Sequence, residues 1–252
     1  FEGRDLKFGD IESVVYLCHL IASRKGIGDL LAQGVKKASQ ALGKGSDHFA
    51  IQVKGLEWSG YESWWAPANM LAYMTCDVGS HHSRAWAITH DIAVGREQME
   101  GKARRVIELQ HIRPMFDMLG ACRLPWVELG IDLNHYADIF SVITGIDYKL
   151  EDLLHASERV WNLTRAFWKR EVPEFGRSFD YPPPRFYKEE IPTGPARGHK
   201  IPMEDLDKLL DDYYQLRGWM KDGLPTREKL LALGLDYVVR DLEAGDTAAA
   251  GT

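Results

Sequence analysis

Apolar residues recur at helical spacing from the start of the chain. After Asp10, which can cap a helix N-terminus, the apolar positions of residues 11–21 fall on one stripe and predict a helix. Asp29 opens a second predicted helix, over residues 29–42, with Gly43 at its end. The face of this second helix that we expect to be buried consists of Leu30, Leu31, Val35, Ala38 and Leu42.

Helical periodicity continues through the middle and end of the chain. A short extended piece, residues 49–53, interrupts it, and Pro67 fits the first turn of a helix over residues 68–76. Further helices are predicted over residues 96–116, 136–144, 150–169, 203–219 and 226–233. The pattern therefore predicts a mostly α fold with few short strands.

These helices group into regions along the chain. Residues 1–178 form a helical region that carries the candidate chemistry, and residues 203–243 form a closing helical segment. Between them, the Pro-rich residues 179–202 are typical of an ordered strap or linker. Residues 244–252 are small and polar, which predicts a disordered tail.

Composition narrows the class of protein. The 252 residues are 45% apolar and 27% charged, as in an ordinary soluble globular protein. The net charge of -6 is spread along the chain without a basic run, which argues against binding to nucleic acid or an anionic membrane. No apolar stretch approaches the roughly 20 residues that span a bilayer.

The chain starts at Phe1 rather than at Met and lacks a signal-peptide pattern. We therefore expect it to begin inside a longer gene product, after processing or as a partial sequence. Its three cysteines are an odd number at wide spacings, which favours a reducing cytoplasm over a disulfide framework. Cys18 and Cys76 lie in apolar helical patterns and are expected to be buried structural thiols.

The most informative segment for chemistry runs from Asp117 to Cys122. The sequence has no phosphate-binding Gly-rich loop, HExxH, CxxC or GxSxG motif. In the segment, Asp117 follows an apolar helix and can accept hydrogen bonds from a ligand. Gly120 allows close backbone approach, and Cys122 could offer a thiolate to iron. Taken alone, the segment is better explained as a helix end with a surface Asp and a buried Cys, because a free Cys usually acts as a small buried hydrophobe.

This DxxGxC pattern resembles the second pterin-binding motif of the tungsten-dependent aldehyde ferredoxin oxidoreductase family. The family pattern has Leu where this chain has Ala121. The resemblance implies that Asp117 and Gly120 bind a metal-bound pterin and that Cys122 is one ligand of a four-iron cluster. It also implies the helical C-terminal domains of that family's fold.

Further segments match the same family in order along the chain. A GxxLAEGV helix start corresponds to residues 28–35, and a VKGLE segment occurs at residues 53–57. An LAY…GxxHxRA pattern covers residues 71–85, and a closing signature lies within residues 213–235. An ordered series of this kind is more specific than any one of its members.

Two residues are candidates for catalysis. His81 and His82 are adjacent and so point in different directions, and only His82 falls on the family's active-site histidine. An imidazole titrates near neutrality and can relay a proton. Tyr61 matches a tyrosine of the substrate pocket, although core packing explains it equally well. The following Trp64 and Trp65 depart from the family pattern and fit either a bulky or aromatic substrate or simple packing.

The resemblance implies an enzyme that oxidises aldehydes to carboxylic acids. It would use a tungsten bis-pterin, a 4Fe-4S cluster and a ferredoxin-like electron carrier. Three of the cluster's cysteines, the first pterin motif and the upstream glutamate have no counterpart here, so a missing N-terminal portion or subunit must complete the site. A reductive relative acting on an aromatic thioester, a non-catalytic fragment or structural subunit, and a plain helical binding module are the alternatives. An oligomer is also compatible with the sequence.

Overall fold

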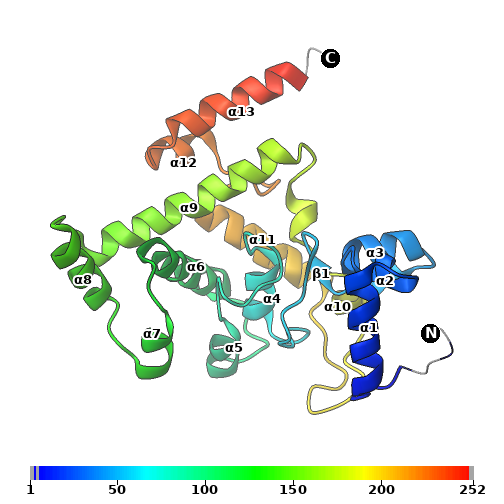
Figure 1. Cartoon of the computed structure of the whole chain (residues 1–252). Coiled ribbons are helices and arrows are strands. Elements are labelled where there is room, and N and C mark those ends of the chain that lie inside the picture. The colour runs from blue at the N-terminus through cyan, green and yellow to red at the C-terminus, as the bar shows by residue number, and fades with distance from the viewer. Residues whose placement is uncertain (1–2, 4–5, 250–252) are drawn as a thin grey trace.

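The computed structural model describes residue 3 and residues 6–249, and helices dominate this part of the chain (Figure 1). One two-stranded antiparallel hairpin pairs β1 (Gln52–Val53) with β2 (Leu56–Glu57). The mostly α fold with few short strands is thereby confirmed. The helices are α1 (Ile11–Ser23), α2 (Ile27–Leu31), α3 (Val35–Leu42), α4 (Pro67–Met74), α5 (Ile88–Val94), α6 (Lys102–Leu119), α7 (Leu124–Leu129), α8 (Asn134–Thr144), α9 (Leu150–Glu171), α10 (Arg185–Lys188), α11 (Met203–Arg217), α12 (Arg227–Ala232) and α13 (Asp236–Ala249), with 3-10 turns η1 (Ser46–His48) and η2 (Arg177–Asp180).

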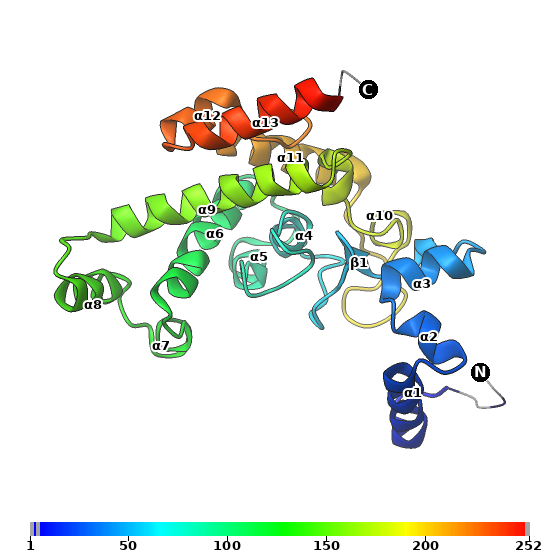
Figure 2. The same cartoon turned by 45° about the horizontal axis from the view of Figure 1, so that its top comes forward.

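Helices α4, α6 and α11 form the centre of the molecule, and the long α9 crosses α6 (Figure 1). Every residue of α4 is buried, so this helix forms the middle of the core. Figure 2 shows α12 and α13 on the far side of α9, and α1 to α3 at the opposite end from α7 and α8. The principal apolar cluster includes Met70, Leu71, Val106, Leu210 and Tyr213.

The first helix begins as expected, whereas the second is broken. The Asp10 carboxylate accepts a hydrogen bond from the Ser13 N–H at 3.2 Å and caps α1. Gly34, at φ 84°, interrupts the predicted helix and starts α3 separately. The Glu57 carboxylate then accepts from the Val35 N–H at 2.7 Å. Of the face expected to be buried, only Ala38 is buried, and Leu42 is exposed.

The turn of the β-hairpin places the side chain of a lysine in the interior. Lys54 and Gly55 form the two-residue turn with φ values of 56° and 92°, the left-handed conformation that such hairpins require. The Lys54 ammonium donates to the Met74 carbonyl at 2.6 Å and pairs with Asp180 at 2.6 Å. These buried contacts hold a non-glycine residue in an otherwise unfavourable backbone conformation.

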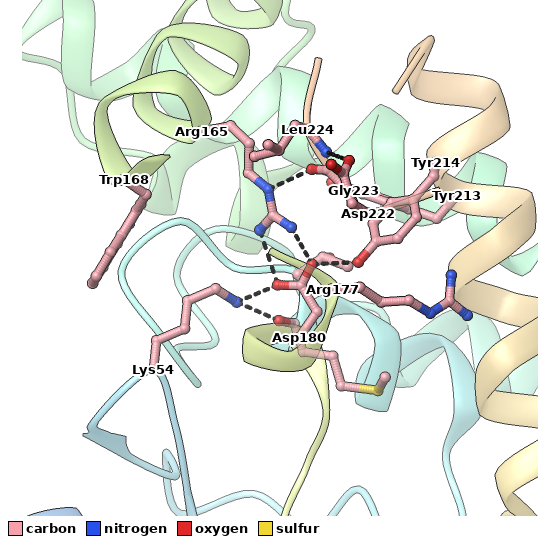
Figure 3. Close-up of polar contacts among 12 residues, drawn as sticks. Lys54, Arg165, Trp168, Arg177, Asp180, Tyr213, Tyr214, Asp222, Gly223 and Leu224 are labelled. Carbon is pink, nitrogen blue, oxygen red and sulfur yellow. Dashed lines mark hydrogen bonds and ion pairs between the residues drawn. The ribbon is translucent and has the colours of Figure 1, made fainter. Parts of the chain in front are cut away.

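Buried polar contacts also anchor the Pro-rich strap under α9 (Figure 3). Asp180, at the end of η2, forms ion pairs with both Lys54 and Arg165 and accepts from the Tyr214 hydroxyl at 2.6 Å. Burial opposes ionisation of Asp180, but the two cations outweigh it and lower its pKa to about 2. Arg165 Nε donates to the Gly223 carbonyl at 2.7 Å. The start of the strap is therefore part of the core.

Three short helices, α5, α7 and α10, and the C-terminal helix were not predicted from the pattern. Two predicted helices also differ in extent: α2 and α3 replace the single helix over residues 29–42, and α6 starts at Lys102 because Gly101 precedes it at φ 80°. Helix α13 continues to Ala249, so residues 244–249 are helical where a disordered tail was expected. Residues 250–252 of that expected tail lie outside the described residues.

The two cysteines that were expected to be buried differ in their environment. Cys76 is buried as expected, and burial raises the pKa of its thiol to about 12. Cys18 is exposed, so the prediction that it is a buried thiol is wrong. The apolar stripe of α1 that contains Cys18 lies on the surface of this chain, with Ile11, Val14 and Val15 also exposed.

Candidate functional site

A pocket of about 280 Å³ brings the two candidate catalytic residues together. Tyr61 lies in the loop after β2, and His82 lies in the loop between α4 and α5. Their rings meet edge to face with centroids 5.1 Å apart, and Trp86 packs against Tyr61 at 4.4 Å. The sequence separation of these residues gave no indication of this contact. The resemblance alone pointed to both.

His82 is oriented by a serine that the sequence did not single out. Ser59 Oγ and His82 Nδ1 are 2.8 Å apart and share a hydrogen bond. Burial, together with the charges of His81, Arg123 and Arg113, lowers the pKa of His82 below its ordinary value of 6.5. The imidazole is therefore neutral at pH 7. With Nδ1 engaged by Ser59, Nε2 is the ring nitrogen that remains to exchange a proton with a ligand.

Two arginines make the same pocket electropositive. Arg113 is only 6% exposed, its Nε has no hydrogen-bond partner among the described residues, and its guanidinium lies 5.5 Å from the Trp126 ring centroid. Burial and the charge of Arg123 lower the pKa of Arg113 to about 10. Glu128 also lines the pocket, but no ion pair joins it to either arginine in the part of the chain that the structure describes. The pocket thus suits an anion.

The candidate cofactor residues lie at the C-terminal end of α6. Gly120 ends this helix in the left-handed conformation at φ 63°, as the sequence predicted for a backbone turn. Asp117, in the last turn, is 59% exposed in its side chain, and Cys122 is an exposed free thiol. The alternative reading of Cys122 as a buried cysteine is therefore wrong.

Two contacts tie this turn to the histidine loop. Arg84 forms an ion pair with Asp117, and its Nε also donates to Asp77 at 3.1 Å. Arg123, directly after Cys122, donates to the Ser83 hydroxyl at 2.8 Å. The Asp117–Cys122 turn and the His82 loop, some forty residues apart in sequence, are consequently held side by side. Asp117, Gly120 and Cys122 do not themselves line the pocket.

The side chains of this turn are suited to contact one side of the expected pterin and iron cluster. Asp117 offers carboxylate oxygens to donors, and Cys122 offers one thiolate of the four that an iron cluster needs. Within the described residues, no group of three or more His, Cys, Asp or Glu side chains could hold a metal ion. An iron cluster bound through Cys122 would therefore need its other ligands from outside the described residues.

The adjacent tryptophans have different environments. Trp64 is buried and lines a second pocket, which also reaches Tyr61. Trp65 stacks on His199 of the strap at 3.6 Å between ring centroids and lies 5.6 Å from the Arg96 guanidinium. Trp64 therefore faces a pocket, whereas Trp65 packs against His199 and Arg96.

The sequence matches a family profile over residues 1–235, described as aldehyde ferredoxin oxidoreductase, domains 2 and 3. It is 32% identical over 239 residues to the tungsten-containing aldehyde ferredoxin oxidoreductase of Pyrococcus abyssi, covering 92% of this chain and 38% of that protein. A Pyrococcus furiosus protein named aliphatic sulfonate oxidoreductase, WOR-like subunit, is 26% identical and covers 96% of this chain, and 37% of its own length is matched.

A solved structure shares the fold. The active-site complex of a benzoyl coenzyme A reductase, in complex with 1,5-dienoyl-CoA, superimposes with a TM-score of 0.68 at 24% identity, over 94% of this chain and 40% of that one.

By these matches, the chain corresponds to the helical part of larger oxidoreductases. The chain belongs to the aldehyde ferredoxin oxidoreductase family. It spans about two-fifths of the length of the curated relatives that it matches, 38% of the Pyrococcus abyssi protein. In the described part of the chain, no helix has the length and apolar character needed to cross a membrane.

Proposed function

We propose that this chain, completed by the upstream portion or subunit, is part of an enzyme that oxidises an aldehyde to a carboxylic acid. In this reaction an aldehyde and water give a carboxylic acid, two protons and two electrons. The observation that carries the proposal is the joining of the Tyr61–His82 pocket to the Asp117–Cys122 turn through Arg84 and Arg123. The substrate pocket and the cluster that accepts the electrons would then lie next to each other.

A tungsten bis-pterin would take up the two electrons when bound, with a 4Fe-4S cluster passing them singly to a ferredoxin-like carrier. In this chain, the Asp117 carboxylate would accept hydrogen bonds from the pterin, and Gly120 would allow its close approach. Cys122 would ligate one iron. The exposure of Asp117 and Cys122 supports these assignments, because a buried turn could not meet a second polypeptide.

His82 would act as the base that removes a proton as water adds to the aldehyde carbon. Its lowered pKa supports this role, because a neutral imidazole can accept a proton at pH 7. Ser59 holds the ring, and the Tyr61 hydroxyl would orient the carbonyl oxygen. Arg113 and Arg123 would favour the carboxylate product, which is an anion in a pocket that excludes part of the solvent.

Replacing His82 tests this role. In the complete enzyme, purified without oxygen, His82→Ala should lower kcat about 100- to 10,000-fold and leave the tungsten content unchanged. Because catalysis requires the neutral imidazole, the wild-type rate should fall only at pH values below the lowered pKa, itself below 6.5. His135→Ala is the matched control, since His135 is exposed on α8 and lines neither this pocket nor the one beside Trp64. Equal losses in both variants would contradict the role of His82.

A second candidate function is reduction of an aromatic thioester. The same residues would then act while electrons pass from the cofactors to the substrate. The aromatic pocket lined by Trp64 favours it. Turnover assays with an aldehyde and with an aromatic thioester separate the two. A non-catalytic subunit would instead contain neither tungsten nor iron after correct assembly. A reducing cytoplasm is the proposed location, and the three free thiols support it. No nucleic-acid partner is proposed, because the chain has no basic run.

A further inference from the structure

A second cavity, of about 360 Å³, lies on the other side of Tyr61. Its walls come from the loop that follows β2 and from α10 of the strap. The residue roles proposed above for aldehyde oxidation leave this space without a function. The residues that matter for its shape are Ile51, Trp58, Gly60, Tyr61, Trp64 and Phe186.

Three aromatic rings give the cavity a preformed apolar wall. The ring centroid of Phe186 lies 4.9 Å from that of Trp58 and 5.7 Å from that of Trp64. Both indole N–H groups are engaged elsewhere, since Trp58 donates to the Tyr61 carbonyl at 3.1 Å and Trp64 donates to the Glu189 carbonyl at 3.0 Å. The rings therefore present carbon surface to the cavity and are held in place.

The charged residues at the cavity are already partnered. Glu62 accepts from the Trp64 backbone N–H at 2.6 Å. Arg185 donates to the Glu189 carboxylate at 3.0 Å, and its guanidinium lies 5.2 Å from the Trp64 ring centroid. A ligand that fits this cavity thus gains from ring stacking and burial of carbon rather than from charge.

Tyr61 connects the cavity to the pocket of His82, because it lines both. We propose that the cavity is a substrate subsite for an aromatic or similarly flat apolar group, whose reactive end reaches Tyr61 and His82. The inference rests on the proposed function, since it assigns a substrate class to that enzyme. It also explains Trp64, which lines the cavity, and sets it apart from Trp65, which does not.

The test compares 2-naphthaldehyde with acetaldehyde as substrates of the complete enzyme, purified without oxygen. Trp64→Leu removes one wall. Gly60→Leu fills the space from an exposed position where an added Cβ meets nothing within 4 Å and the backbone is not left-handed. Trp65→Leu is the matched control. Tungsten and iron contents establish that each variant is assembled.

The ratio of kcat/KM for 2-naphthaldehyde over acetaldehyde should fall about tenfold or more in Trp64→Leu and Gly60→Leu. It should change less than about threefold in Trp65→Leu. An unchanged ratio in Gly60→Leu, with acetaldehyde still oxidised, overturns the subsite and leaves the proposed function standing.

A wild-type enzyme that oxidises neither aldehyde overturns the proposed function instead. The cavity is then judged by equilibrium dialysis with neutral 2-naphthol. Binding that weakens about tenfold in Gly60→Leu, but not in Trp65→Leu, supports an aromatic site. Equal binding by all variants, or no binding by the wild type, refutes it.

Discussion

Asp180 is the residue on which the contacts of the strap converge. Replacing it by Asn would leave the ammonium of Lys54 and the guanidinium of Arg165 buried without a balancing charge. We expect Asp180→Asn to destabilise the fold by about 3–5 kcal/mol, seen as a lower midpoint of thermal unfolding. Asp211→Asn, which breaks an exposed pair with Arg177, should cost no more than about 1 kcal/mol. Similar midpoints for the two variants would contradict a structural role for Asp180.

Among single residues, those in family motifs could be predicted from the sequence more often than those recognisable only by their chemical type. The positions of Tyr61 and His82 came from the family resemblance, whereas Asp117 was first singled out by its place before Gly120 and Cys122; the structure places Tyr61 against His82. Their assigned roles remain predictions. Ser59 and Arg113 were missed, because an isolated serine and one arginine in a helical pattern carry no signal of what they face. Arg123 had a signal, since it directly follows Cys122.

Among the elements, α1 and α2 meet at a glycine that permits close contact. A Cβ on Gly28 would lie 2.2 Å from the backbone carbonyl of Leu20, so Gly28→Ala must push the two helices apart. We expect a destabilisation of about 1–3 kcal/mol, measured by thermal unfolding and by faster amide exchange in α1. Gly60→Ala is the control, because its Cβ would enter open space. Unchanged exchange in α1 of Gly28→Ala would refute this packing argument.

Long amphipathic helices were predictable, and short or terminal ones were not. Helices α8, α9 and α11 repeat their apolar positions over enough turns for the period to be read, and their limits agree with the expected ranges to within two residues. Helix α13 was missed because its second half is small and polar. Its first half packs Val238 and Val239 against Ala166 of α9 and Leu230 of α12, which stabilises a helix that composition alone disfavours.

For the whole molecule, the exposed apolar surface agrees with a chain that needs a partner. Ile11 on α1 is 75% exposed, and Val142 and Ile143 on α8 are 84% and 78% exposed. Scattered exposed residues are ordinary, but rows along two helices at opposite ends are typical of surfaces that another polypeptide covers. The length of the relatives supports the same interpretation, since this chain covers 38% of the Pyrococcus abyssi protein.

The central claim is that this chain supplies one edge of a divided cofactor site through Asp117 and Cys122. Its most direct test is the tungsten and iron content of the complete, anaerobically purified enzyme, with all polypeptides counted by intact mass. The wild type should contain about one tungsten and about four iron atoms per chain. Cys122→Ser should lose the four-iron cluster, whereas Cys18→Ser, which changes another exposed thiol, should keep it. Cluster content unchanged in Cys122→Ser would contradict the account.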